Sequence, residues 1–203
     1  DIFAGYVAAQ IGLPVAQLMI ATNVNDILAR TLDSGAYETG EVVATSSPSM
    51  DIQVSSNFER LLFELSGRDA DRVRALMGSL KQSGGFALND TELHLMRALF
   101  AAKRVDADET LTTMRDVLAH NGFQIDPHSA IGVAAAKSAV LAQDVPMVTL
   151  ATAHPAKFPK AVWQAYETEP DTPQRVTDML DLPEQFTPVS NNLAAVQALI
   201  REK

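Results

Sequence analysis

Val15-Ala-Gln-Leu-Met-Ile-Ala21 decides the fold class of this chain, because a short and largely apolar run is typical of a strand buried on both faces of a sheet. Apolar residues at helical spacing precede it, over Ile2–Ile11. After it, the short polar side chains of Asn23-Val-Asn-Asp26 can cap a helix that begins near Ile27 and ends at Ser34-Gly35. Helix, strand and helix in this order predict an α/β crossover unit of a parallel sheet.

A second apolar run, Val145–Ala151, has the same character and predicts a second buried strand. Two prolines follow it, and a helix is expected near Lys160–Tyr166. Glu41–Thr45 is a weaker candidate, for an edge strand. Because a parallel sheet usually needs about four or more strands to close its core, two convincing strands predict only a part of an α/β domain.

Helical patterns fill most of the remaining chain. The expected helices are Phe58–Leu65, Ala70–Lys81, Asn89 to about Lys103, Asp106–His120, Ser129–Leu141 and, after a Pro-rich connector, Asn191–Glu202. The chain is therefore divided into residues 1–57 and 128–166 as two pieces of one α/β domain, 58–127 as a helical insertion, and 167–203 as a C-terminal helical tail.

Composition excludes several classes of function. Hydrophobic residues make up 47% of the 203 residues, close to the globular average, so the chain can bury a sizeable core. A formal charge of -9 without Lys or Arg runs argues against nucleic acid as a partner. The chain has no cysteine, which fits a reducing cytoplasm, and no apolar stretch of the roughly 20 residues that a membrane helix needs. We expect a soluble, cytoplasmic protein.

The first residue, Asp1, opens directly into a helical pattern without a preceding loop or capping box. We therefore expect that further protein precedes Asp1, and that an apolar edge is exposed along Ile2–Ile11 and Val15–Ala21. Complete coverage of that edge by the chain's own residues would contradict this expectation.

Chemistry in open α/β sheets takes place beyond the carboxyl ends of the strands, which points to the polar segments Thr22–Asp26 and Thr152–Lys157. A helix N-terminus is also an anion site when a glycine-rich loop precedes it, so Asp1 is a third candidate position.

Six segments of the chain, taken in order, resemble one known family. They are Asp1-Ile-Phe-Ala-Gly-Tyr6, Ala21-Thr-Asn-Val-Asn-Asp-Ile-Leu28, Ser47-Pro-Ser-Met-Asp-Ile52, Ser55-Ser-Asn-Phe-Glu-Arg-Leu-Leu-Phe63, Asp126-Pro-His-Ser-Ala130 and Ala151-Thr-Ala-His-Pro-Ala-Lys-Phe158. They look like the long-form bacterial and fungal threonine synthases, from Asp1 to about Tyr166. The resemblance implies a fold-type II lyase that uses pyridoxal 5'-phosphate (PLP) to convert O-phospho-L-homoserine and water into L-threonine and phosphate.

The resemblance also implies which residues bind the cofactor. Asp1 matches the last residue of the family's Gly-Asn-Phe-Gly-Asp loop, which binds the cofactor phosphate, and Thr152 matches the threonine whose hydroxyl faces the pyridine nitrogen. A neutral hydroxyl does not hold that nitrogen protonated, which moderates the electron sink and favours elimination over transamination. The alternative is that Thr152 merely ends a strand.

Polar residues near the two strand ends are candidates for substrate binding. His154 and Lys157 can face the substrate phosphate, with a capping histidine and a surface lysine as equally good explanations. Asn23, Asn25 and Asp26 can line the same crevice, with helix capping as the alternative.

A third polar group lies at the start of the fourth of the six segments that carry the resemblance. Ser55, Ser56 and Asn57 can donate hydrogen bonds to a phosphate, although an N-cap for the helix that begins at Phe58 is the commoner use of such residues.

The family's Schiff-base lysine lies in an N-terminal segment that has no counterpart in this chain. None of the chain's lysines occupies a matching motif: Lys81, Lys103, Lys137, Lys157, Lys160 and Lys203. We therefore expect that the chain alone is inactive and that the missing N-terminal portion is its partner. The histidines lack further ligands at metal-binding spacing, so no metal site is expected, and His128 is interpreted as structural.

Two other hypotheses remain open. Another fold-type II PLP lyase, of the threonine dehydratase or cysteine synthase kind, would share the scaffold, but Ser55–Arg60 and the helical insertion resemble threonine synthase. A non-catalytic scaffold of this family would explain the missing lysine, but it would not need the intact run Thr152–Lys157.

Overall fold

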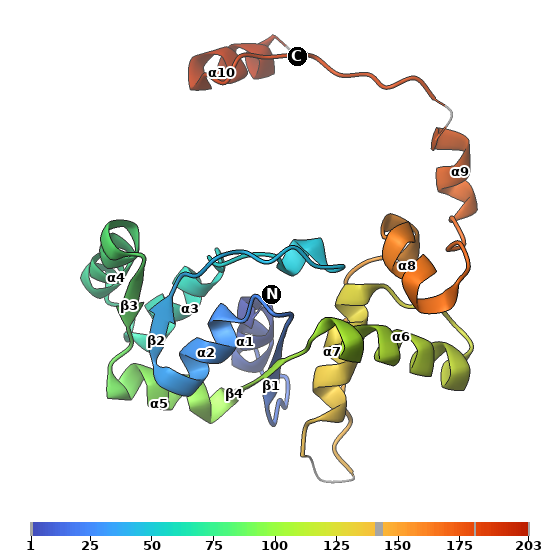
Figure 1. Cartoon of the computed structure of the whole chain (residues 1–203). Coiled ribbons are helices and arrows are strands. Elements are labelled where there is room, and N and C mark those ends of the chain that lie inside the picture. The colour runs from blue at the N-terminus through green and yellow to red at the C-terminus, as the bar shows by residue number, and fades with distance from the viewer. Residues whose placement is uncertain (1, 141–143, 181, 203) are drawn as a thin grey trace. The chain divides into compact units, whose positions relative to one another are not determined.

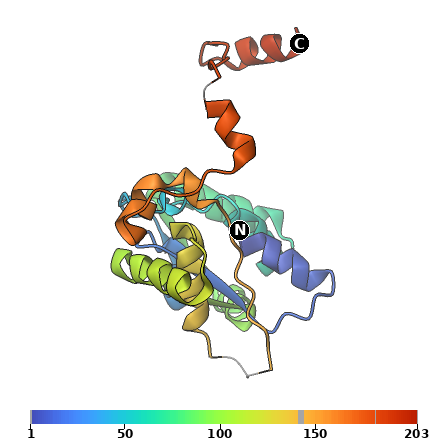
Figure 2. The same ribbon diagram turned by 90° about the vertical axis from the view of Figure 1, so that its right-hand side faces the viewer.

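The structure is a computed structural model, and it describes residues 2–140, 144–180 and 182–202. The chain forms two compact units, residues 1–171 and residues 172–203. Helices make up most of the regular structure in each unit (Figure 1 and Figure 2).

A two-stranded parallel sheet forms the α/β part of the first unit. β1 (Leu18–Thr22) pairs with β4 (Phe100–Arg104), and the pair contacts α1 (Ile2–Gln10), α2 (Ile27–Ser34) and α7 (Pro127–Lys137) (Figure 1). The expected α/β class, a parallel sheet with flanking helices, is confirmed.

The two faces of β1 point into different cores. Ile20 packs in a core with Leu28 of α2 and Phe100 of β4, whereas Ala21 packs against a core that contains Ile131 of α7. Because alternate residues of a strand point to opposite faces, helices cover this strand on both sides. The strand predicted from Val15–Ala21 is therefore confirmed, although it begins at Leu18.

A helix-rich part of the first unit is built around a stack of aromatic rings. Its elements are β2 (Ala36–Glu38), α3 (Phe58–Leu65), α4 (Ala70–Ser83), β3 (Gly85–Ala87) and α5 (Asp90–Leu99), and β2 and β3 pair antiparallel. The ring of Tyr37 on β2 lies 5.1 Å from that of Phe58 and 4.7 Å from that of Phe86, measured between centroids. Gly84 ends α4 with φ 78°, a left-handed conformation that suits glycine.

A second helical group follows β4. It consists of α6 (Ala107–Asn121), α7, the 3-10 turn η2 (Pro155–Lys157) and α8 (Pro159–Tyr166). Its core is formed by Met114, Val117, Ile125, Ala130, Val162 and Ala165.

The second unit contains two helices, α9 (Gln174–Leu180) and α10 (Leu193–Arg201). The side chain of Asn192 caps α10 by accepting a hydrogen bond from the Ala195 N–H at 3.2 Å. α10 confirms the last helix expected from the sequence, whereas α9 lies in the stretch expected to be a connector.

The helix expected to run from Asn89 to about Lys103 ends earlier, at Leu99, and its last residues belong to β4. The sequence has no glycine or proline there, and the apolar pattern of the helix continues into Phe100 without a break. The strand forms because β1, about eighty residues away in the chain, supplies its backbone hydrogen bonds. The expected helix Ser129–Leu141 is shifted as well, since α7 ends at Lys137.

The expectation of a second buried strand at Val145–Ala151 is wrong. This segment has no regular secondary structure, and Val148 and Leu150 are 76% and 70% exposed. A strand requires a neighbour that completes its backbone hydrogen bonds, and none of the residues that the structure describes pairs with this segment.

The edge strand expected at Glu41–Thr45 is also wrong. Side chains rather than a neighbouring strand satisfy the backbone here, because the Val43 N–H donates to Asn25 Oδ1 and the Thr45 N–H donates to Asp51 Oδ2. The edge pairing occurs upstream instead, in β2.

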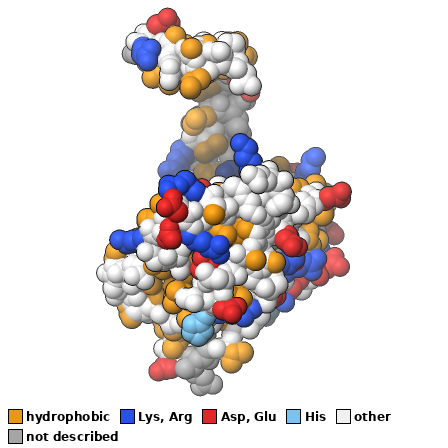
Figure 3. Space-filling view, turned by 90° about the vertical axis from the view of Figure 1, so that its left-hand side faces the viewer, with side chains coloured by type: hydrophobic (Ala, Val, Ile, Leu, Met, Phe, Trp, Pro, Cys, Tyr) orange, Lys and Arg blue, Asp and Glu red, His pale blue; other side chains and the backbone are white. Residues whose placement is uncertain are grey.

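The apolar edge expected along Ile2–Ile11 and Val15–Ala21 is exposed only in part, because Ile2, Phe3, Tyr6 and Leu18 pack against a core and Ile20 is buried. α1 has no buried residue, and Val7 and Ile11 are 40% and 80% exposed. On the side of the first unit that carries α4 and β3, acidic and basic side chains are interspersed, so that side has no continuous basic surface (Figure 3). No helix among the described residues has the length and apolar character required to span a bilayer.

Candidate functional site

Asn23 lies directly beyond the carboxyl end of β1, and its side chain is buried in a polar cluster. Its Nδ2 lies 2.9 Å from Thr45 Oγ1, 3.0 Å from Ser47 Oγ and 2.8 Å from Asp51 Oδ1. Its Oδ1 accepts a hydrogen bond from the backbone N–H of Asn25 at 2.8 Å. The amide of Asn23 therefore joins the strand end to the segment that contains Thr45, Ser47 and Asp51.

Asn25 strengthens the same connection. Its Oδ1 accepts from the Val43 N–H at 2.8 Å, and its Nδ2 donates to Val43 O at 2.9 Å and to Asp51 Oδ1 at 3.1 Å. Asn25 does not cap α2, so helix capping is the wrong explanation for it. Instead, Asn23 and Asn25 hold the chain between residues 43 and 51 against the strand end.

Asp26 occupies the N-cap position of α2 but makes no capping hydrogen bond. Its carboxylate lies 2.9 Å from Arg30 Nε and 3.5 Å from Arg104 Nε. Both arginine side chains are about half exposed. Asp26 therefore joins α2 to the end of β4.

Thr22 leaves a buried hydroxyl without a partner at the same strand end. The residue is 8% exposed, and among the residues that the structure describes its Oγ1 is the buried side-chain oxygen or nitrogen that has no hydrogen bond. Buried polar groups of native proteins nearly always have a partner. The Thr22 hydroxyl is therefore a buried hydrogen-bonding group that the described residues leave unpaired.

Asp51 is the central acceptor of the polar cluster, so replacing it by alanine is expected to loosen the chain around it. Thr45 N–H and Oγ1 both donate to its carboxylate, at 2.8 and 2.7 Å. We expect the Thr45 amide to exchange its hydrogen about tenfold faster in Asp51→Ala, the effect of losing roughly 1.4 kcal/mol of local stability. Hydrogen exchange read by mass spectrometry would measure this.

The exposed neighbour Ile52 provides the matched control. It is 43% exposed, so Ile52→Ala should leave the exchange of the Thr45 amide unchanged. Equal exchange in wild type and Asp51→Ala would mean that the carboxylate does not hold this segment.

The second polar segment, Thr152–Lys157, lies on the surface of the first unit. Thr152 is exposed, and its hydroxyl makes no hydrogen bond with any residue that the structure describes. His154 Nδ1 accepts from the Ala156 N–H at 3.2 Å and caps η2, which agrees with the capping alternative. The Lys157 side chain is exposed and forms no ion pair with the described residues. Among the described residues, neither the Thr152 hydroxyl nor the Lys157 ammonium therefore has a partner.

Ser55, Ser56 and Asn57 precede α3, and each of them has different contacts. The Ser55 N–H donates to Tyr37 Oη at 2.8 Å, and Ser56 is exposed. Asn57 occupies the N-cap position, but its Oδ1 accepts from Arg60 Nη1 at 2.6 Å and makes no capping hydrogen bond. Side-chain capping therefore does not explain these residues.

His128, which Asp126 orients, contacts Ser49 and Phe158, and sequence reasoning missed this connection. His128 Nε2 accepts from the Ser49 N–H at 3.2 Å, and its ring centroid lies 4.6 Å from that of Phe158. Its Nδ1 lies 2.8 Å from Asp126 Oδ2. Asp126 followed by Pro127 is a recognisable helix start, but the sequence contains no sign of the contact with Ser49.

Burial and hydrogen bonding act in opposite directions on Asp126. Burial raises the pKa of this carboxyl, but hydrogen bonds from His128 and Ser129 outweigh it, so the pKa lies below its ordinary value. Asp126 is therefore ionised at neutral pH and accepts hydrogen bonds with both oxygens.

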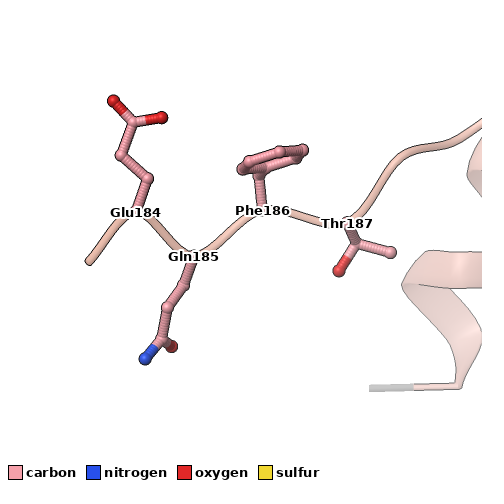
Figure 4. A pocket seen from close by; sticks show the side chains of 4 residues that line it. All are labelled: Glu184, Gln185, Phe186 and Thr187. Atoms are coloured by element: carbon pink, nitrogen blue, oxygen red, sulfur yellow. The ribbon is translucent and has the colours of Figure 1, made fainter.

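Other candidate positions contribute less. Asp1 lies outside the described residues. No cluster of three His, Cys, Asp or Glu side chains that could hold a metal ion occurs in residues 2–140, 144–180 and 182–202. A shallow hollow in the second unit is lined by the consecutive residues Glu184–Thr187, whose side chains point alternately to opposite sides of an exposed segment (Figure 4), so they do not enclose a ligand.

Known proteins match this chain over its whole length. A family model described as "Threonine synthase, C-terminal" matches residues 129–200. A threonine synthase of Pseudomonas aeruginosa is 45% identical over 203 residues, and one of Saccharomyces cerevisiae is 41% identical over 180 residues. These matches cover 100% and 80% of this chain, but 43% and 35% of the relatives.

Solved structures agree with the sequence matches. A PLP-bound threonine synthase from Brucella melitensis is 55% identical with a TM-score of 0.90, and a yeast threonine synthase is 34% identical with a TM-score of 0.83. Both cover the whole chain, which in turn covers 43% and 45% of them. The chain therefore spans less than half the length of the proteins that it matches.

Proposed function

Because this chain belongs to the threonine synthase family and matches its C-terminal portion, we propose that it is part of an enzyme that converts O-phospho-L-homoserine and water into L-threonine and phosphate. The observation that carries the proposal is the match of the entire chain, in sequence and in fold, to a PLP-bound threonine synthase. The activity is proposed for the longer protein, in the cytoplasm, and not for this chain alone.

We propose PLP as the cofactor, and the residues present fit it. When bound, PLP withdraws electrons from the substrate and makes the loss of its protons and phosphate possible. The exposed and unpaired hydroxyl of Thr152 is proposed to face the pyridine nitrogen, and as a neutral group it would not keep that nitrogen protonated. Asp1 is proposed to lie beside the cofactor phosphate. The unpaired Thr22 hydroxyl supports a further polar partner at the end of β1.

For the substrate, we propose that Lys157 and His154 bind the phosphate. The Lys157 ammonium is exposed, and a cation without an internal partner is suited to a phosphate dianion. Ser55, Ser56 and Asn57 are proposed as further donors to that phosphate.

Asn23, Asn25 and Asp26 are proposed to form the wall of the crevice. They are proposed to act by holding residues 43–51 in place, since the side chains of Asn23 and Asn25 are hydrogen-bonded within the chain.

We propose the same division of the chain into domains that its sequence predicts. Residues 1–57 and 128–166 are proposed to belong to the PLP-binding domain, 58–127 to an insertion and 167–203 to a C-terminal tail. The lysine that holds the cofactor is proposed to lie in the N-terminal portion, so the chain alone would be inactive.

The test uses the full open reading frame that contains this chain. Purified protein with PLP is expected to release phosphate from O-phospho-L-homoserine and to form L-threonine in equal amounts. Thr152→Val should lower kcat about tenfold or more, because it removes the hydroxyl, whereas Thr152→Ser should stay close to wild type. The isolated chain should release no phosphate.

Other outcomes would overturn the proposal. A protein that shows a PLP absorbance band removed by borohydride, but that acts on threonine or O-acetylserine instead, would be the other kind of lyase. A full-length protein that neither takes up PLP nor turns over any of these substrates would be a non-catalytic scaffold.

A further inference from the structure

His128 is held by both nitrogens of its ring. The residue is 8% exposed, and its Nδ1 lies 2.8 Å from Asp126 Oδ2 while its Nε2 accepts from the Ser49 N–H at 3.2 Å. A nitrogen that accepts a hydrogen bond from an amide carries no proton, and a nitrogen beside a carboxylate must donate. In this geometry Nε2 is the acceptor and Nδ1 the donor toward Asp126, so the Nε2 lone pair is engaged by the Ser49 N–H.

The Ser49 contact reaches the polar cluster at the end of β1. Ser49 lies in the 3-10 turn η1 (Pro48–Met50), and the residues on either side of the turn, Ser47 and Asp51, both accept from Asn23 Nδ2. The turn is thus held from one side by Asn23 and from the other by His128. Met50 is also packed beside α7, against the core that contains Ile131.

The ring of His128 also contacts Phe158, which directly follows the second polar segment. It lies at 51° to the ring of Phe158, with 4.6 Å between centroids. Phe158 follows directly after η2, the turn that carries Lys157, and its backbone carbonyl begins α8 by accepting from the Val162 N–H. One imidazole therefore contacts both the Pro48–Met50 turn, which Asn23 holds, and the residue that directly follows Lys157.

We propose that His128 is a positioning residue, which fixes the Pro48–Met50 turn relative to the Thr152–Phe158 segment and so sets the geometry of the site. This inference rests on the proposed function for its catalytic consequence, while the contact itself is independent of it. Asp126 contributes by holding the proton on Nδ1, which leaves Nε2 as the acceptor for Ser49. The acceptor at the Nε2 position is the feature that matters.

Two replacements of His128 separate the acceptor from the rest of the side chain. His128→Gln can place a carbonyl oxygen near the former Nε2 and keep an acceptor for the Ser49 N–H. His128→Asn can keep a donor toward Asp126 but is too short to reach Ser49. Ser49→Ala is the matched control, because the backbone N–H remains.

The experiment uses the full-length protein with PLP. We expect kcat/KM for O-phospho-L-homoserine to fall about tenfold or more in His128→Asn and to stay within about threefold of wild type in His128→Gln and Ser49→Ala. Independently of activity, hydrogen exchange of peptides that cover residues 47–51 should be about tenfold faster in His128→Asn alone.

The outcomes distinguish the inference from the proposed function. A wild-type protein that does not use O-phospho-L-homoserine overturns the proposed function, and the exchange result then still decides the contact. If wild type is active and both His128 variants match it in kcat/KM, or if Gln and Asn lower kcat/KM and accelerate exchange equally, His128 is not a positioning residue.

Discussion

Replacing Arg72 by methionine is expected to lower the free energy of unfolding by about 3 kcal/mol, the lower end of the range for breaking a buried ion pair. Arg72 Nε and Nη2 each lie 2.9 Å from an oxygen of Glu92, and the Glu92 side chain is 3% exposed. Methionine preserves the apolar stem but leaves the carboxylate buried with the Asn89 N–H at 2.8 Å as its remaining donor. The lower end is expected because Arg72 itself is 32% exposed.

The difference in unfolding free energy between wild type and Arg72→Met is expected to depend on pH, with a definite sign. The hydrogen bonds from Arg72 hold the pKa of Glu92 below its ordinary value. Because the pKa is lower in the folded state, the stabilisation is complete above the unfolded pKa and disappears as the pH falls through the folded pKa. The stability gap between wild type and Arg72→Met should therefore be full at pH 7 and shrink below about pH 4.

Urea denaturation of the chain at both pH values would measure the gap. The control is Arg74→Met, since Arg74 pairs with Asp71 on the same helix but both side chains are mostly exposed, and less than about 1 kcal/mol is expected from an exposed pair. If both variants lost the same stability, burial of Glu92 would have no consequence.

Local signals in the sequence were sufficient to predict most of the helices. The capping box of Asn89 and Glu92 is formed by both of its hydrogen bonds, and Gly35, Gly84 and Gly122 all end helices in the left-handed conformation. These signals depend on residues within a few positions of each other, so the sequence alone determines them.

Strands were harder to predict because their partners are distant in the chain. Phe100–Arg104 reads as the end of a helix until β1 is placed beside it. Val145–Ala151 reads as a buried strand, but an apolar run says nothing about whether a partner exists, and here the side chains are exposed. Secondary structure that depends on pairing cannot be assigned from one segment.

The sequence indicated the end of β1 as a candidate site, but it did not indicate the hydrogen bonds formed there. The sequence indicated the end of β1, and Asn23 and Asn25 lie there in a polar cluster. It did not indicate Asp51 or Ser49, because their contacts with Asn23 and His128 join residues that are 28 and 79 positions apart. His128, interpreted as structural, is buried and contacts Ser49 and Phe158, residues that the sequence did not connect.

Replacing Asp126 by alanine is expected to lower the free energy of unfolding by about 3–5 kcal/mol, because several buried donors lose their acceptor together. Asp126 is 0% exposed. Its carboxylate accepts from His128 N–H at 2.9 Å, from His128 Nδ1 at 2.8 Å and from both the N–H and the hydroxyl of Ser129. Since its pKa is lowered in the folded state, this stabilisation too is complete above about pH 4 and is lost as the pH falls further.

Asp106→Ala separates the effect of burial from that of helix capping. Asp106 caps α6 in the same way, through the Glu109 N–H at 2.9 Å, but it is exposed, so its loss should cost only about 1 kcal/mol. Chemical denaturation of both variants at pH 7 would show the difference. The penalty for one buried unpaired group is roughly 2 kcal/mol. If Asp126→Ala loses at least about that much more stability than Asp106→Ala, the buried donors of His128 and Ser129 depend on this carboxylate. Equal costs would mean that Asp126 acts as a helix cap and does not hold the imidazole in place.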